Sequence, residues 1–412
     1  MKMQFKMVTF VLLILCSGLS AQQTALDTTT FVVVGGGLSA GVVDSVLTAE
    51  SQKQSYPALM AAQMNALMPL PQFRDGGPVP VTSMDLGSKT LPPTNQSTLR
   101  ALPFPLFTFN VSVPLLKVWE GFQSRPARPL VPDGDYKQSL INLVMGYPEL
   151  TIENPVSWSQ IEYVEMMAPT FVIVEMGFGD VIEGALNGDA SKITGSAPFA
   201  TDYGNMATRL KNTTATVMLM TVPDPTDMAY FATVEQVAAD LGIGADQLRQ
   251  QFGIQPGDLV TLGGRVEISE RLLGRRNDAL SSSALLRASV VAAVQGAVSG
   301  MNTAITSAAS SNGFKVFDLN AFTKEVRTQG VRAGSAQLSG NYLGGFYSGD
   351  GLFPTPTGQA VLANRLLDFV NTNYRTSFPN VAYDSVPRQL PPATPLGPGA
   401  ESLIAVPRMP RR

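Results

Sequence analysis

The stretch FVVVGGGLSAG, residues 31–41, contains the clearest structural boundary in this 412-residue chain. A β-branched apolar run at 31–34 is followed by three glycines at 35–37 and then by a helix-like segment. An apolar run that stops at a tight turn predicts a buried strand, and the next segment predicts a helix. In an α/β sheet such a junction lies at the carboxyl end of a strand, where ligands bind.

Similar apolar runs recur along the chain and predict further buried strands. They lie at 140–144, 170–175, 215–222 and 314–319. Helix-like segments separate or flank them, at 55–67, 161–167, 285–309 and 356–371. This alternation predicts an α/β fold, a doubly wound parallel sheet flanked by helices, over residues 31–380.

A segment at 227–273 interrupts this alternation with amphipathic helical patches at 234–241 and 245–252. We interpret it as a helical insertion over one end of the sheet. Two roles stay open for it, a lid over a site or a surface excursion. The Pro-rich residues 385–412 predict an extended C-terminal tail outside the folded domain.

The first 21 residues have the pattern of a signal peptide, with Lys2 and Lys6 before a short apolar run and small residues near Ala21. We therefore expect an exported protein, cleaved near Ala21, in the periplasm, on the outer surface or outside the cell. The apolar run is shorter than the ~20 residues that span a bilayer, so no transmembrane anchor is expected.

The composition restricts the chemistry, because the chain has no histidine and a single cysteine, Cys16, within the predicted signal peptide. The usual general base and zinc ligand are therefore absent, and no cofactor or transition metal is expected. An all-oxygen cation site at 132–135 stays open, although an acidic turn is the commoner explanation. A net charge of −3 does not favour nucleic acid as a partner.

Two motifs resemble conserved blocks of the SGNH (GDSL-type) hydrolases, a lipase and esterase superfamily. The junction GGGLS resembles the first block, Gly-Asp-Ser-Leu-Ser, with Gly36 at the aspartate and Gly37 at the nucleophilic serine. The sequence SGDGLFPTPTG, residues 348–358, resembles the last block. There Asp350 matches the triad acid, and Phe353 stands three residues later at the histidine.

Two further blocks complete the resemblance. In GFGD, residues 177–180, Gly179 stands at the asparagine that donates to the oxyanion, and in LVMGYP the match places Gly146 at the oxyanion-hole glycine. The four blocks run in the family's order from residue 31 to about 373, with Gly146 between the first and third blocks. The resemblance implies an SGNH-hydrolase-like, flavodoxin-like three-layer fold with these positions in one cleft.

The replacements remove the nucleophile, the oxyanion amide and the base, so the resemblance favours a non-catalytic pseudo-hydrolase over an enzyme. Binding would use Gly36, Gly37, Gly146, Gly179 and Asp350, and family analogy suggests an acyl, ester or carbohydrate ligand. A hydrolase with an atypical site, such as water activated by Asp350, is the alternative, and a purely structural protein is the third.

The frame around each replaced position is intact. From the sequence alone we therefore expect Gly37→Ser, Gly179→Asn and Phe353→His together to restore some esterase activity. Ser39 is not expected to act as a nucleophile instead, because no histidine is present to activate it.

Overall fold

The computed structural model describes residues 26–73, 79–80, 100, 105, 107–130, 135–146 and 157–387. The predicted signal peptide, residues 1–21, most of the turn at 132–135 and nearly all of the predicted Pro-rich tail lie outside the described residues.

A parallel four-stranded sheet forms the centre of the molecule, in the order β1-β4-β5-β9. Its strands are β1 (Phe31–Gly35), β4 (Phe171–Glu175), β5 (Thr216–Met220) and β9 (Lys315–Phe317). The register pairs Phe31 with Phe171 and Gly35 with Glu175. Every residue of β1 and β4 is buried, which explains why these strands are continuous apolar runs in the sequence.

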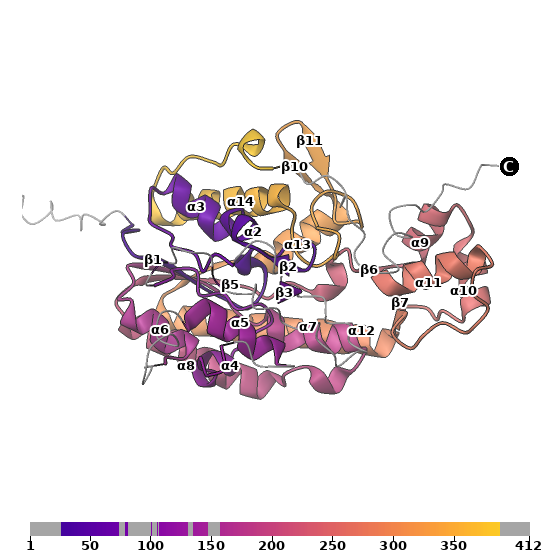
Figure 1. Ribbon diagram of the computed structural model, residues 1–412, viewed down its shortest axis with the longest axis horizontal. Helices are drawn as coiled ribbons and strands as arrows, with labels where there is room; N and C mark the ends of the chain where they lie inside the picture. Colours follow the sequence, from indigo (N-terminus) through magenta and orange to yellow (C-terminus); the bar gives the residue numbers. More distant parts are fainter. Residues whose placement is uncertain are drawn as a thin grey trace, which may run out of the picture.

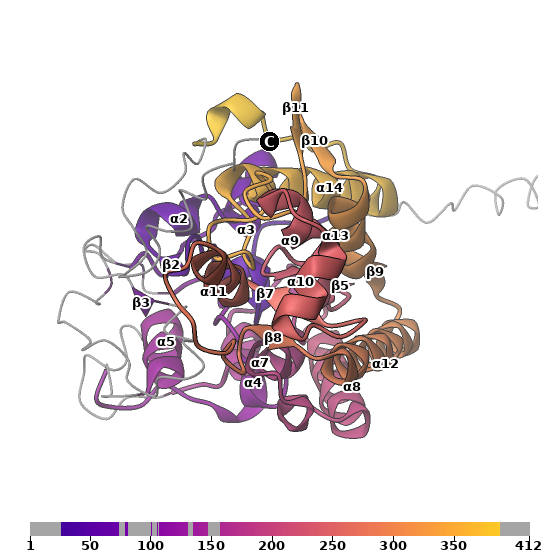
Figure 2. The same ribbon diagram turned by 90° about the vertical axis from the view of Figure 1, so that its right-hand side faces the viewer.

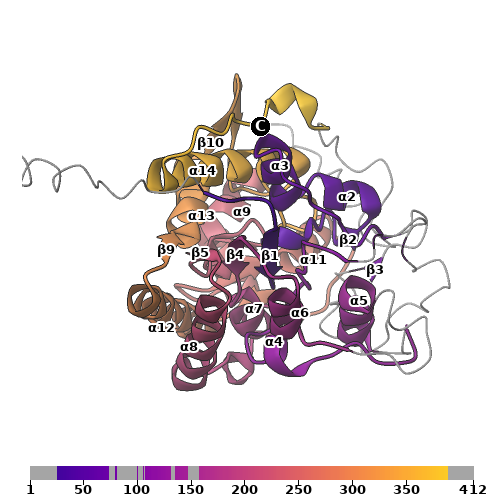
Figure 3. The same cartoon turned by 90° about the vertical axis from the view of Figure 1, so that its left-hand side faces the viewer.

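Helices cover both faces of this sheet and make three layers (Figures 1 and 3). One face carries α3 (Tyr56–Gln63), α13 (Leu319–Thr328) and α14 (Pro356–Tyr374), and the other carries α6 (Gln160–Met166), α8 (Ser196–Asn212) and α12 (Ala288–Asn312). The main body also contains the helices α2 (Ala49–Lys53), α4 (Glu120–Gln123), α5 (Tyr136–Met145) and α7 (Phe178–Asn187). Its short strands are the pair β2 (Val46–Leu47) and β3 (Val79–Pro80) and the hairpin β10 (Val331–Ala333) and β11 (Ala336–Leu338). The predicted α/β class with a helix-flanked parallel sheet is confirmed.

One predicted strand is wrong, because residues 140–144 lie within helix α5. Asp135 caps that helix by accepting a hydrogen bond from the Gln138 amide, and a short apolar run fits a buried helix as well as a strand. An irregular segment at 109–113 lies beside β1 instead. There the Val33 amide donates to the Phe109 carbonyl at 2.8 Å.

The insertion forms a lobe beyond the carboxyl ends of the strands, with a hydrophobic core of its own (Figures 1 and 2). It contains α9 (Val234–Leu241), α10 (Ala245–Phe252) and α11 (Leu262–Leu272), and an antiparallel sheet of β6 (Phe231–Ala232), β7 (Leu259–Thr261) and β8 (Leu285–Leu286). The lobe is therefore mixed rather than helical, and it extends past the predicted boundary at 273 to the third strand.

Helix α12 is the one described helix that is long and apolar enough to cross a membrane. A single such helix is weak evidence, and α12 packs against α7 and α8 in a layer of the domain. A transmembrane anchor is therefore not indicated.

Candidate functional site

The turn that follows β1 is closed rather than open to solvent. Residues 35–40 are all buried, and the short 3-10 helix Leu38–Ala40 begins directly after Gly37. Glu175 ends the neighbouring strand β4, and its backbone carbonyl accepts a hydrogen bond from the Gly36 amide at 2.9 Å. The register of the two strands therefore places a carboxyl group beside the triple-glycine turn.

The Glu175 carboxyl group lies against the backbone amides that the glycines leave exposed. It accepts a hydrogen bond from the Ser39 amide at 3.1 Å, and the nearby amides of Gly37 and Leu38 also lower the pKa of its carboxyl. Consecutive amides at a strand-to-helix turn form a site suited to an anion or an oxyanion. In this chain an internal carboxyl group already fills that site.

Ser39 and Glu175 form a buried serine–carboxylate pair that the sequence did not reveal. The Ser39 Oγ donates to Glu175 Oε2 at 2.8 Å, and the two residues are 0% and 2% exposed. Burial raises the pKa of the Glu175 carboxyl to about 7, against the opposing effect of its hydrogen bonds. Distance and pKa suit a nucleophile and its base, but burial keeps substrate away from both.

Three of the predicted site positions come together through aromatic packing. A Cβ added to Gly37 would lie 3.0 Å from the Cβ of Phe178, the residue that precedes Gly179. The Phe178 and Phe353 rings meet edge to face, with centroids 6.5 Å apart. Phe353 is 1% exposed, so the first, third and last blocks converge in the protein core rather than around an open cleft.

Asp350 joins the last block to the segment that follows the glycine turn. Its carboxylate accepts hydrogen bonds from the amides of Leu352 at 2.8 Å, Phe353 at 2.9 Å and Ser45 at 2.8 Å. Burial raises the pKa of Asp350, and these amides oppose the rise. Because its oxygens hold the backbone in place, Asp350 has a structural role, and activation of water by it has no support in this geometry.

The Ser45 contact belongs to a two-residue turn in which Asp44 and Ser45 both have positive φ, 50° and 64°. Neither residue is a glycine, so this conformation is strained. The turn is held by the 348–350 loop, because the Asp44 amide donates to Ser348 Oγ at 3.0 Å and the Gly349 amide donates to Asp44 at 2.6 Å. We call these three hydrogen bonds, the third being that of the Ser45 amide with Asp350, the clasp.

The structure does not bring Gly146 to this group. Gly146 ends α5, and the Val144 carbonyl near it accepts from Thr108, which precedes the segment beside β1. The loop that faces the glycines comes after that segment. A Cβ on Gly36 would lie 2.5 Å from the Leu116 carbonyl oxygen. The match of LVMGYP to the family's block placed Gly146 in the site, but residues 115–116 are the ones that face Gly36 and Gly179.

The same packing contradicts the expected repair of activity. A side chain at Gly179 would meet the carbonyl oxygens of Leu115 and Leu116 at 2.4 and 2.5 Å, and one at Gly37 would meet Glu175 Oε1 at 2.5 Å. Real Cβ atoms do not approach backbone as closely as one at Gly179 would, so the triple change is expected to disrupt the fold through Gly179→Asn.

Asp180, the matched last residue of the GFGD block, is buried at 1% exposure. Its Oδ2 accepts from the Val118 amide at 2.9 Å, and burial raises the pKa of its carboxyl to about 6. It fixes the loop that carries Leu116 and lies beside the site as a positioning residue.

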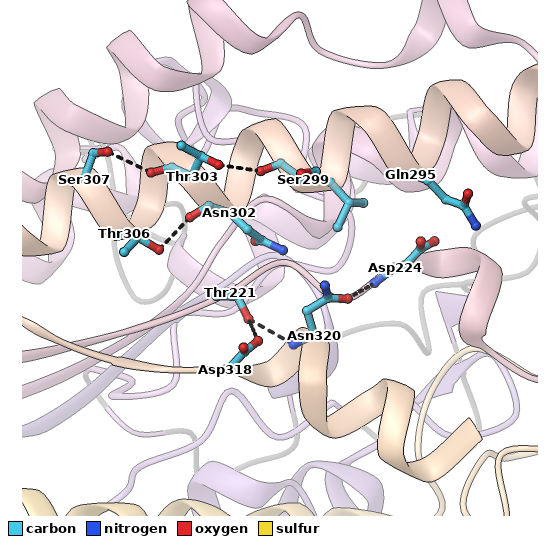
Figure 4. A pocket seen from close by; sticks show the side chains of 11 residues that line it. Thr221, Asp224, Gln295, Ser299, Asn302, Thr303, Thr306, Ser307, Asp318 and Asn320 are labelled. Carbon is cyan, nitrogen blue, oxygen red and sulfur yellow. Dashed lines mark hydrogen bonds between the residues drawn. The ribbon is translucent and has the colours of Figure 1, made fainter. Parts of the chain in front are cut away.

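A separate polar groove of about 510 Å³ lies at the same edge of the sheet, between α12 and the carboxyl ends of β5 and β9 (Figure 4). Thr221 and Asp318 follow those two strands, and Asn302 lines the groove from α12. Nothing in the periodicity of the sequence identified this groove. Within the described residues, no three His, Cys, Asp or Glu side chains are grouped to hold a metal ion.

No protein-family model matches this chain, and no curated protein matches it significantly.

Proposed function

We propose that this chain is an exported, non-catalytic protein built on the SGNH hydrolase fold, whose role is to bind a ligand or a partner. The observation that carries the proposal is the Glu175 carboxylate in the turn amides at the nucleophile position. Gly37 and Phe353 supply neither a nucleophile nor a base there. An ester would find the oxyanion position filled and the surrounding space closed by phenylalanine rings.

The test is an ester-hydrolysis assay on the purified mature protein with a short-chain nitrophenyl ester. We expect turnover equal to that of buffer containing an unrelated protein. Mass spectrometry of exported protein gives an independent check of processing, with an N-terminus near residue 22 expected. Turnover that persists through purification and disappears in Ser39→Ala would contradict a non-catalytic role.

The second candidate is a hydrolase with an atypical site, and the Ser39–Glu175 distance of 2.8 Å favours it over a purely structural protein. A carboxyl with a pKa of about 7 is suited to act as a base near neutral pH. This candidate requires the turn to open and expose Ser39. It predicts activity that is lost in both Ser39→Ala and Glu175→Gln, with Ser385→Ala, a change at an exposed serine, as the control.

The acyl, ester or carbohydrate ligand suggested by the family analogy does not fit the closed centre. The lobe adds a further barrier, since the Tyr230 amide at its base donates to the Gly351 carbonyl at 2.8 Å, beside Asp350. We therefore propose that ligand binding takes place elsewhere on the molecule.

A further inference from the structure

The groove between α12 and the ends of β5 and β9 has the location and size of a small-molecule site. Its volume of about 510 Å³ lies within the roughly 300–1,000 Å³ typical of such sites. Crevices at the carboxyl ends of parallel strands are where α/β proteins bind ligands. None of its lining residues belongs to the closed turn, so this inference does not depend on the proposed function.

Two aspartates give the groove its charge. Asp318 Oδ1 accepts from Thr221 Oγ1 at 2.9 Å and from the Ala321 amide, and Asp224 Oδ1 accepts from the Thr226 amide and hydroxyl. Among the described residues, no Lys or Arg forms an ion pair with either aspartate, and neither Oδ2 accepts a hydrogen bond. No Lys or Arg lines the groove. It therefore disfavours anions and lacks a positive partner for its own carboxylates.

The opposite wall, on α12, offers further acceptors. The hydroxyls of Thr303, Thr306 and Ser307 donate to carbonyls of their own helix at 2.9, 2.8 and 2.9 Å. Their protons are thus committed, while their oxygen lone pairs stay available. All three residues are exposed and line the groove (Figure 4). This wall complements a ligand rich in hydroxyl donors.

We propose that this groove binds a small hydroxylated amine, of the amino-sugar class. The ammonium group lies on the side of Asp224 and Asp318, and the hydroxyl groups donate to the α12 wall. A charge-assisted hydrogen bond is stronger than a neutral one, so the ammonium supplies most of the selectivity. Neutral sugars lack that contact, and simple polyamines lack the hydroxyls.

Calorimetric titration of the full mature chain with glucosamine, glucose and spermidine tests the proposal. We expect glucosamine to bind about tenfold more tightly than glucose or spermidine. Asp224→Asn and Asp318→Asn should each weaken glucosamine binding about tenfold, while Asn keeps the capping hydrogen bonds of both positions. Asp384→Asn removes an exposed carboxylate outside the groove and should change nothing.

A steric pair of variants tests the location without altering charge. Ser307→Tyr fills the groove from α12 and should abolish binding, whereas Ser311→Tyr, an exposed serine one turn further along and outside the lining, should leave it intact. Equal affinity for glucosamine and either other probe would overturn the ligand class. Absence of glucosamine binding, or binding unchanged in Ser307→Tyr, would overturn the site.

Discussion

At the end of β1, three glycines expose backbone amides, and the Glu175 carboxyl group occupies the space in front of these amides. Phe178 and Phe353 close the surrounding space. At the ends of β5 and β9, by contrast, hydroxyls and carboxylates line a groove that stays open. Both places lie at the carboxyl edge of one sheet. The fold therefore favours binding along this whole edge, and side chains decide which part of it is accessible.

The two places also differ in how they tolerate change. The closed turn depends on Gly36 and Gly179, which face backbone carbonyls at distances too short for any side chain. The groove is lined by surface side chains of a helix whose buried face packs elsewhere. Substitutions should therefore affect stability at the turn and affinity at the groove.

Gly179→Ala should have the largest effect on stability, a loss of about 3 kcal/mol or more, because its Cβ would overlap the Leu115 and Leu116 carbonyls. Gly204→Ala in α8 is the control, since nothing lies within 4 Å of its added Cβ. There a gain of up to about 1 kcal/mol is expected from helix propensity. Chemical denaturation of both variants measures the contrast, and equal stabilities would show that the turn is not tightly packed.

Glu175→Ala should empty the anion site at the turn. Formate should then bind in place of the missing carboxylate and stabilise the variant by about 1.4 kcal/mol at tenfold excess over its Kd. Thermal melts with formate, and with chloride at the same ionic strength as the control, measure this effect. A variant that responds no more than the wild-type protein would show that the glycine amides do not form an anion site.

Glu175 should also make stability depend on pH. Its pKa is raised from 4.5 to about 7 by burial, so the folded state holds the proton more tightly than the unfolded state. This contribution is fully present below pH 4.5 and is lost as the pH rises through 7. Between pH 8 and pH 6 we expect unfolding free energy to rise by about 1 kcal/mol, with most of that rise absent in Glu175→Gln. A wild-type profile that is flat or falls toward pH 6 would contradict the assignment.

Ser307→Tyr should have the smallest effect on folding, within about 0.5 kcal/mol, because the residue is an exposed position on α12. Denaturation curves for this variant and for Ser311→Tyr should coincide. A larger loss in Ser307→Tyr alone would mean that the groove is part of the packed structure, like the turn.

The sequence predicted β1 and β4 well because each is a short, fully buried apolar run, at 31–35 and 171–175. The prediction of a strand at 140–144 was wrong, because an apolar run of this length fits a buried helix as well as a strand. A capped ten-residue helix forms there. The prediction also missed the segment at 109–113, which alternates apolar and polar residues but lies within a Pro-rich region. In that region composition obscured a real periodicity.

For the candidate site, the motif spacing predicted Gly37, Phe353 and Asp350 as neighbours. In the structure Phe178 lies between Gly37 and Phe353, and Asp350 accepts a hydrogen bond from the Phe353 amide. The SGNH assignment itself stays a prediction. The contact of Glu175 with the turn was not predictable, because it depends on the register of β1 and β4. The sequence did contain one indication of this contact: Glu175 ends a buried parallel strand, and the carboxyl ends of such strands face the site.

The clasp has a consequence for how the chain reaches its native state. It joins Ser45 to Asp350 across 305 residues, so the strained turn is supported only after nearly the whole domain has been synthesised. Contacts of such long range slow folding, because the entropy of closing the loop is lost before the contact forms. A nascent or C-terminally truncated chain would lack the 348–350 loop, and residues 44–45 would relax to unstrained conformations until it arrives.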